Sequence, residues 1–287
     1  MEIFRALAVL VEHPEEDVAR VAESLEMGPT PDASEYTELF TFQLYPYASV
    51  YLGAEGMLGG EARDRVAGFW RALGQVPPAE PDHLALMLAL YARLIELEES
   101  EGDWLRRQSW HRARKAFLWE HLLSWLPVYL DKVADLAPPF YRQWGEVLSE
   151  ALSTEAVALG KQELLPLQLR EAPGLVDPRN GEVEEFLQSV LSPVRSGMIL
   201  VRSDLGRAAQ RLGLGLRLGE RKFILRSLLS QDAERTLDWL ACEAASWTER
   251  HRMRAEMLGA VATAWEEKAR ATCTLLEEIK LAAKEVR

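Results

Sequence analysis

The chain has 287 residues, with 33 lysines and arginines against 45 aspartates and glutamates, which gives a formal net charge of −12. This charge disfavours general binding to polyanions, and a hydrophobic content of 48% is typical of a globular protein. Two cysteines, Cys242 and Cys273, exclude a disulfide-stapled scaffold and a four-thiolate zinc site, so we expect two core thiols in a reducing compartment.

The charge is distributed unevenly along the chain. Residues 1–110 carry 8 basic and 20 acidic side chains, whereas residues 192–226 carry 8 basic and 2 acidic ones. An acidic first part suits a basic partner, because long-range attraction speeds encounter. The alternative is an acidic surface that only keeps the protein in solution.

The sequence predicts no membrane partner and a cytoplasmic location. No uncharged apolar run approaches the roughly 20 residues that span a bilayer. The start, MEIFRALAVLVEHPEED, combines a short apolar stretch with several acids, which is unlike a secretory signal peptide.

Helical periodicity dominates the first sixty residues. It predicts helices over 4–11, from 15 to about 27, and over 34–42, with the first stopped before Pro14. The segment 45–60 is irregular and rich in glycine, but no Gly-Lys-Ser/Thr follows, so it indicates turns rather than a phosphate-binding loop.

The middle of the chain predicts longer helices. One covers 61–74, a proline-rich linker follows, and Asp82 is expected to cap a helix that is apolar nearly all round and therefore central. A further long stretch over 110–135 is expected to bend or break at Pro127. Pro138 and Pro139 mark the next junction, a candidate hinge.

The remainder of the chain is also predicted to be mostly helical. Helices are expected at about 140–152, 155–171, 182–191, 221–229, 232–252 and 253–286, with a loop at 172–181. The residues MILV at 198–201 and the sequence LGLGLRLG are the only β-like pieces and suggest a small hairpin. The last helix has an apolar seam from Leu258 to Val286, which packs on the body or on another chain.

No constellation of catalytic or metal-binding residues is present in the sequence. The five histidines show neither an i, i+4 pair nor an HExxH motif, and no GxSxG occurs. Paired carboxylates all lie in charged, solvated runs, whereas acid–base catalysis needs a carboxyl in an apolar pocket. We therefore expect a protein that is not an enzyme and has no metal or cofactor.

The basic region 192–226 is the best case for nucleic-acid binding. It superficially suggests a helix-turn-helix, but its glycine-rich middle is longer than the short turn of that motif. With a net charge of −12 we expect no nucleic-acid partner, and a DNA-binding regulator is kept as the less favoured alternative. A helical scaffold or assembly subunit that uses the C-terminal seam is another alternative.

Three stretches, taken in order, resemble the TorD/DmsD/NarJ family of molybdoenzyme (redox enzyme) maturation chaperones. The first runs from Glu35 to Phe40 and on to the sequence PYASVY at 46–51, similar to the family's "YxxLF … P-x-x-S-x-Y" segment. The second is Pro81-Asp82-His83-Leu84, similar to its "PxDH" signature. The third is FLWEHLLSWLP at 117–127, which looks like its "FxxxHLxxWxP" helix.

This resemblance implies an all-helical, non-enzymatic chaperone. Such proteins bind the catalytic subunit of a molybdopterin oxidoreductase, commonly at its twin-arginine signal peptide, and assist cofactor insertion and assembly before export. A receptor for an arginine pair followed by an apolar stretch needs an acidic rim beside an apolar groove. The candidate partner-binding residues are Tyr36, Phe40, Tyr47, Ser49, Tyr51, Trp70, Glu80, Pro81, Asp82, His83, His121 and Trp125.

The expected architecture is all-α, a single helical bundle of about ten helices with a C-terminal helical extension. Residues 1–191 are expected to form the TorD-like chaperone domain, with a possible hinge near 136–139, and 192–287 the extension with its basic start. The protein is expected to be a monomer or a homodimer, possibly one that exchanges helices at the hinge.

Overall fold

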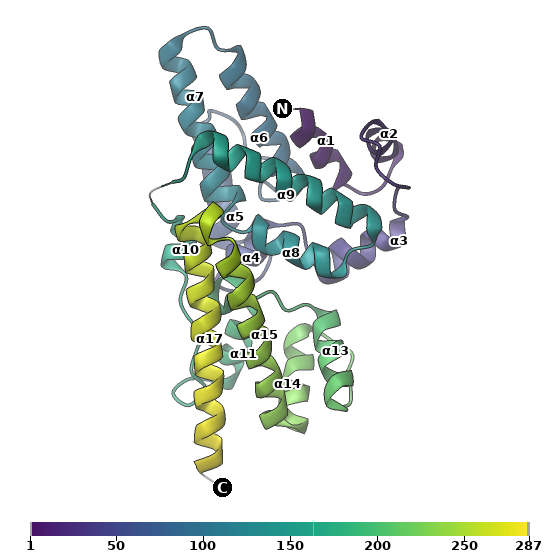
Figure 1. Ribbon diagram of the computed structural model, residues 1–287, viewed down its shortest axis with the longest axis vertical. Helices are drawn as coiled ribbons and strands as arrows, with labels where there is room; N and C mark the ends of the chain where they lie inside the picture. Colours follow the sequence, from purple (N-terminus) through teal and green to yellow (C-terminus); the bar gives the residue numbers. More distant parts are fainter. Residues whose placement is uncertain (1, 163, 286–287) are drawn as a thin grey trace. The chain divides into compact units, whose positions relative to one another are not determined.

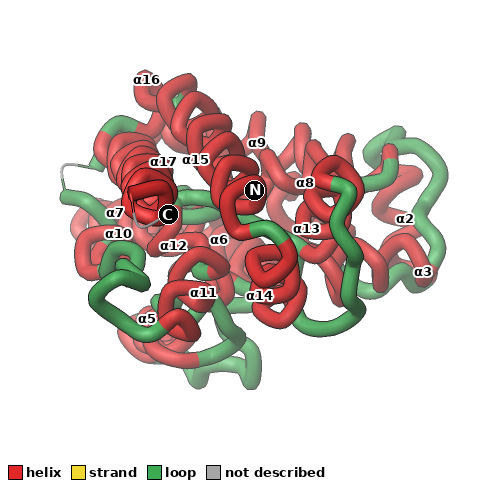
Figure 2. Tube along the Cα trace, turned by 90° about the horizontal axis from the view of Figure 1, so that it is seen from below, coloured by secondary structure: helices red, strands yellow, loops and turns green. Residues whose placement is uncertain are grey.

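The computed structural model is all-α, as the sequence predicts, and describes residues 2–162 and 164–285 (Figure 1). These residues contain seventeen α-helices and two π-helices, and no strand occurs among them (Figure 2). The number exceeds the expected ten because five of the helices have only four or five residues, too few to produce a periodic pattern.

The chain divides into two compact units, each with its own helices. The first comprises residues 1–49 and 58–166, and the second comprises residues 50–57 and 167–287. This division falls near residue 167, whereas the charge changes sign near residue 192. The division into a chaperone domain over 1–191 and an extension over 192–287 stays a prediction.

The first unit is built around one apolar helix. Its elements are α1 (Glu2–Leu10), α2 (Glu16–Ser24), α3 (Ala33–Tyr36), η1 (Thr37–Gln43), α5 (Gly60–Ala72), α6 (Leu84–Ser100), α7 (Trp104–Phe117), η2 (Leu118–Leu122), α8 (Leu126–Leu136) and α9 (Pro139–Leu159), and the division between the units falls within α4 (Ala48–Leu52). Helix α6 packs against α1, α7 and η2, and nine of its residues are buried. The prediction of a central helix here is confirmed.

The stretch over 110–135 breaks next to Pro127, as expected: η2 ends at Leu122, and Pro127 lies in the first turn of α8, where a missing N–H costs nothing. Two other expectations about the helices of this unit need correction. Helix α9 runs unbroken from Pro139 to Leu159 in place of two helices. The third predicted helix becomes a short α-turn followed by the π-helix η1, in which bonds reach five residues back, as from Leu44 N–H to the Leu39 carbonyl at 2.7 Å.

The second unit is organised by two long antiparallel helices. Its elements are α10 (Leu167–Glu171), α11 (Val183–Leu191), α12 (Pro193–Ser196), α13 (Arg202–Leu212), α14 (Arg221–Gln231), α15 (Ala233–Met253), α16 (Ala255–Leu258) and α17 (Ala260–Glu285). Helices α15 and α17 run side by side (Figure 1), with His251 against Trp265 near one end and Lys280 paired to Asp238 near the other. The predicted apolar seam of the last helix packs here, except for Val286, which lies outside the described residues.

The turn after α12 is fixed by both long helices. Gly197 has a φ of +74°, and a Cβ built on it would lie 2.2 Å from the backbone nitrogen of Ala269 in α17. His251 Nε2 donates to the Gly197 carbonyl at 2.7 Å, and Thr272 Oγ1 donates to the Ser196 carbonyl at 2.8 Å. Only glycine allows both this backbone conformation and the close approach of α17.

Two further expectations about this unit are wrong. The β-like pieces do not pair as a hairpin: residues 198–201 form a buried extended link into α13, and the glycine-rich stretch is the loop between α13 and α14. The cysteines are not core thiols either, since Cys242 is exposed and Cys273 partly exposed on α15 and α17. In the described part of the chain, no helix combines the length and apolar composition needed to cross a bilayer.

Replacing Gly197 by alanine tests this packing. Gly197→Ala is expected to lower the free energy of unfolding by about 2–4 kcal/mol, because the new methyl group meets the α17 backbone and φ is unfavourable for alanine. Gly213→Ala, at another positive φ but with open space around the position, is the matched control and should cost about 1 kcal/mol. Equal losses in urea unfolding would show that the contact with α17 is not what demands glycine.

Candidate functional site

A short backbone pairing joins two of the three motifs identified in the sequence. Tyr47 and His83 form an isolated antiparallel bridge. The Ala48 N–H donates to the Asp82 carbonyl at 3.0 Å, and the Leu84 N–H donates to the Pro46 carbonyl at 2.8 Å. These bonds hold the segments that start α4 and α6 side by side, although they are more than thirty residues apart in the sequence.

Asp82 reinforces this pairing from beneath the surface. Its side chain is 1% exposed, and Oδ2 accepts a hydrogen bond from the Ser49 N–H at 3.1 Å, in the first turn of α4. The prediction that Asp82 caps its own helix is wrong, because His83 is the N-cap of α6 and its Nδ1 accepts from the Ala85 N–H at 3.3 Å. Ser49, also buried, accepts from the Gly59 N–H through Oγ at 3.1 Å.

The side chains on the outer side of the pairing are polar and aromatic. The Tyr47 hydroxyl donates to Glu80 Oε2 at 3.0 Å, and the Tyr47 ring stands edge-on to the His83 ring with centroids 4.8 Å apart. Burial, followed by the neighbouring Glu80 carboxylate, raises the pKa of Tyr47, so the phenol keeps its proton. Glu80 itself is exposed, and Pro81 is buried in the same turn.

Glu12 and Tyr36 are grouped with Tyr47, Glu80 and His83 because Glu12 acts electrostatically on His83 and Tyr36 acts on Tyr47. Burial and then the Glu12 carboxylate raise the pKa of Tyr36. Burial lowers the pKa of His83, against the opposing effects of Glu12, Glu80 and Asp82. We call Glu12, Tyr36, Tyr47, Glu80 and His83 the Tyr47 cluster. Glu12 was not predicted: it follows α1 among several acids, and nothing in the sequence separates it from them.

Tyr36 links the Tyr47 cluster to an aromatic part of the core. Its ring lies 5.3 Å from the ring of Phe40 and 6.5 Å from that of Tyr141. Phe40 is 2% exposed and also contacts Trp144, so it supports Tyr36 from below instead of facing a partner. The capping box at Asp32 and Glu35 fixes the start of the helix that carries Tyr36.

The other predicted site residues lie in different surroundings. Trp125 is fully buried and donates from Nε1 to the His121 carbonyl at 2.8 Å. Trp70 is half-buried on α5, and its Nε1 has no hydrogen-bond partner among the described residues. Tyr51 is 3% exposed and falls in the second compact unit.

His121 is a buried neutral imidazole in the π-helix η2. It packs against the rings of Phe69 and Phe117, with centroids 5.4 and 5.2 Å away. Burial, aided by the positive charge of Arg65, lowers the pKa of His121 to about 4. Its Nδ1 is buried and finds no hydrogen-bond partner in the described part of the chain.

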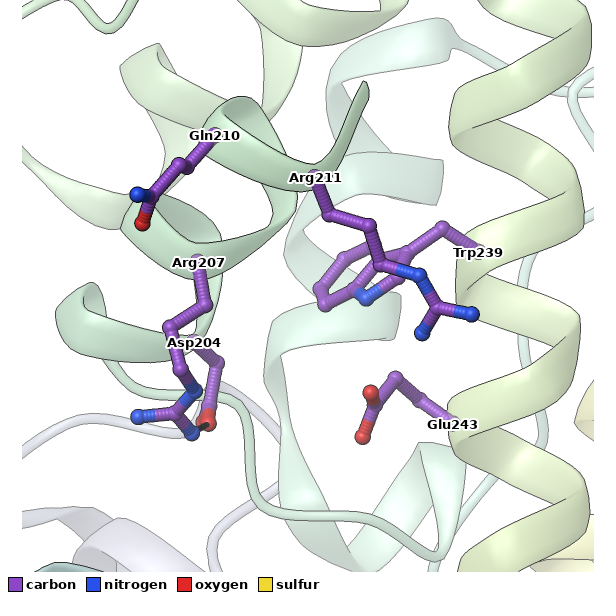
Figure 3. Close-up of a pocket in the computed structure, with 6 residues that line it drawn as sticks. All are labelled: Asp204, Arg207, Gln210, Arg211, Trp239 and Glu243. Atoms are coloured by element: carbon purple, nitrogen blue, oxygen red, sulfur yellow. Dashed lines mark hydrogen bonds and ion pairs between the residues drawn. The ribbon is translucent and has the colours of Figure 1, made fainter. Parts of the chain in front are cut away.

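A separate hollow of about 340 Å³ lies in the second unit between α13 and α15 (Figure 3). It is lined by two arginines, two acids, an amide and an indole: Asp204, Arg207, Gln210, Arg211, Trp239 and Glu243. Asp204 is 3% exposed, accepts from the Val201 N–H at 2.8 Å and pairs with Arg207. The two arginines of the hollow are matched by its two acidic residues, and none of the predicted site residues lines the hollow.

No metal centre is evident in the residues that the structure describes, because they contain no group of three or more histidine, cysteine or acidic side chains placed to hold an ion. The Tyr47 cluster instead offers carboxylates, phenol rings and a neutral imidazole at a surface. Carboxylates and a neutral imidazole can accept hydrogen bonds from a cationic or other hydrogen-bond-donating group.

Comparison with known proteins concerns the part of the chain that carries this cluster. Residues 10–131, less than half of the chain, match the family described as nitrate reductase delta subunit. The match covers the three motifs and all of the Tyr47 cluster.

Two curated relatives match part of the chain. Both are described as "Chaperone protein TorD", from Vibrio vulnificus strains YJ016 and CMCP6, and each is 38% identical over 95 residues. The match covers 31% of this chain and 44% of each relative, so the chain spans less than half the length of the relatives that it matches. No solved structure matches the chain at a significant level.

Substitution of Asp82 tests its structural role. Asp82→Ala leaves the buried Ser49 N–H without an acceptor and is expected to lower the free energy of unfolding by about 1–3 kcal/mol. Glu80→Ala, two residues away and exposed, is the matched control and should change it by less than about 0.5 kcal/mol. Similar values for the two variants in urea unfolding would contradict the role assigned to Asp82.

The buried histidines predict a loss of stability in mild acid. Burial lowers the pKa of both His121 and His251 to about 4 in the folded protein. In the unfolded chain each histidine has its ordinary pKa near 6.5, so below that pH the unfolded chain binds protons that the folded protein does not bind. The free energy of unfolding should therefore fall as the pH drops from 6.5 towards 4, by about 2 kcal/mol per histidine at pH 5. In urea unfolding, the His121→Leu variant should show a smaller fall in the free energy of unfolding between pH 7 and pH 5, because the contribution of His121 is removed. An unchanged fall in that variant would contradict the assignment.

Proposed function

We propose that this protein is a cytoplasmic, non-enzymatic chaperone that binds the catalytic subunit of a molybdopterin oxidoreductase. In this proposal it recognises the subunit's twin-arginine signal peptide and holds the subunit during cofactor insertion, before export. The match of residues 10–131 to the nitrate reductase delta subunit family, and the similarity to two proteins described as chaperone protein TorD, support the general role. The proposed position of peptide recognition is the Tyr47 cluster.

The observation that carries the proposal is the placement of two exposed carboxylates beside aromatic rings. Glu12 and Glu80 both act on His83, and Glu80 is oriented by the Tyr47 hydroxyl at 3.0 Å. An arginine guanidinium presents a planar fork of donors that fits a carboxylate and also stacks on aromatic faces. The Tyr47 cluster supplies both kinds of contact for an arginine of the client.

The neutral state of His83 suits this role. A protonated His83 imidazole would neutralise part of the charge of Glu12 and Glu80, which attracts a guanidinium. Because burial lowers the pKa of His83, the ring stays neutral at physiological pH and its edge contact with Tyr47 is preserved. We therefore assign to His83 the positioning of Tyr47, and to Asp82 the positioning of the backbone that carries both.

The remaining predicted residues are assigned to support. Phe40, Ser49, Pro81 and Trp125 are buried and shape the surface from within, while His121 stabilises η2. A monomer or a homodimer that exchanges helices at 136–139 stays part of the proposal, as does the role of 192–287 as an extension.

A peptide with two adjacent arginines followed by an apolar stretch tests this proposal. Calorimetry should show binding, and the variant with both Glu12→Gln and Glu80→Gln should bind roughly tenfold more weakly, because each exposed charge pair contributes about 0.7 kcal/mol. Replacing both arginines of the peptide by glutamine should have a similar effect on the wild-type protein.

The control variant is Glu99→Gln, which removes an exposed carboxylate of the same unit outside the Tyr47 cluster. It should bind the peptide as the wild type does. Equal weakening by Glu99→Gln and by the double variant would indicate that overall charge, and not this cluster, attracts the peptide.

A further inference from the structure

The loop between α13 and α14 exposes apolar side chains in the most basic region of the sequence. Leu218 is 86% exposed and Leu216 51% exposed, and Phe223, in the first turn of α14, is 46% exposed. We call these three residues the leucine–phenylalanine patch. Such side chains cost free energy in water, so their clustering on one short segment indicates a surface that contacts something apolar.

Hydrogen bonds hold this loop in place. The Gln231 side chain donates from Nε2 to the Gly215 carbonyl at 2.9 Å, and its Oε1 accepts from the Gly215 N–H at 2.7 Å. A Cβ on Gly219 would lie 2.8 Å from Cδ1 of Phe223, so the ring packs tightly on this glycine. The leucines are therefore presented by an anchored loop and do not fold back onto α15.

Positive charge surrounds the patch. Within the part of the chain that the structure describes, Arg217 makes no ion pair, and it lies between the two exposed leucines in the sequence. Lys222 and Arg226, on either side of Phe223, both pair with the single carboxylate of Glu184. Counted with Arg221, these basic residues leave a local excess of two positive charges over the carboxylates of Glu184 and Glu220.

We propose that the leucine–phenylalanine patch docks the second unit onto an anionic lipid surface. Aliphatic and phenylalanine side chains flanked by arginine and lysine suit the boundary between headgroups and acyl chains, with the cations at the lipid phosphates. A protein partner fits less well, because leucine is under-represented among the residues that dominate protein interfaces. The proposal does not depend on the function proposed above.

This contact is peripheral and is compatible with the overall composition. The prediction of no membrane partner rests on the lack of a bilayer-spanning run, which a surface contact does not need. The net charge of −12 opposes approach to an anionic surface, but charges separated by more than about 8 Å are largely screened at physiological salt. The cations around the patch therefore dominate its own interaction with lipid.

Sedimentation with lipid vesicles tests the proposal on the full chain. The protein should sediment with phosphatidylcholine vesicles that contain phosphatidylglycerol and stay in solution with vesicles of phosphatidylcholine alone. Leu218→Ser and Arg217→Glu should each weaken binding to the anionic vesicles at least fivefold. Val76→Ser, at an 89% exposed apolar residue of the first unit, is the matched control and should bind as the wild type does.

Other outcomes overturn the proposal. Failure of the wild type to bind anionic vesicles contradicts it, as does equal binding to both kinds of vesicle. If Arg217→Glu weakens binding while Leu218→Ser does not, the surface attracts anions without inserting into lipid, and an acidic protein segment becomes the better occupant. Circular dichroism on each variant confirms that these exposed substitutions leave the fold intact.

Discussion

The pairing of residues 46–49 with 82–84 is the constraint on which the candidate site depends. It is made by two backbone hydrogen bonds and by the buried carboxylate of Asp82, which accepts from Ser49. In a chain whose described residues contain no strand, this bridge brings Tyr47, Glu80 and His83 to one surface. The helices α4 and α6 start from the bridge, so the same contacts that define the site also set the entry of the central helix into the core.

Burial separates the residues that hold this surface from the residues that we propose face a partner. Asp82 and Ser49 lie beneath the bridge, where their hydrogen bonds contribute to stability, whereas Glu12 and Glu80 are exposed and determine the charge of the surface. Tyr36 and Tyr47 are partly buried. The Tyr36 ring contacts the ring of Phe40, and the Tyr47 ring contacts that of His83. In the proposed site, the PxDH-like sequence therefore acts through His83 and the preceding Glu80, while its aspartate is hidden from solvent.

The all-α class and the central helix after Pro81 could be predicted from the sequence. Tyr47, Glu80 and His83 lie in short motifs, and the structure brings them together. What Asp82 caps could not be predicted, since the Ser49 N–H is distant in the sequence. The sequence prediction missed Glu12 because an acid after α1 has no distinguishing local pattern. It also missed both π-helices, since a five-residue hydrogen-bond spacing leaves no clear mark in hydrophobic periodicity. Leucine alternation at 212–218 suggested a strand, whereas the structure shows an anchored loop.

The central claim is that the Tyr47 cluster is where a client peptide binds. Hydrogen–deuterium exchange of the full chain, with and without a peptide that carries an arginine pair and an apolar stretch, tests it most directly. The account predicts slower exchange in the segments around Glu12, Tyr47 and His83 when the peptide is present. Slower exchange confined to the second unit, with these segments unchanged, would contradict it.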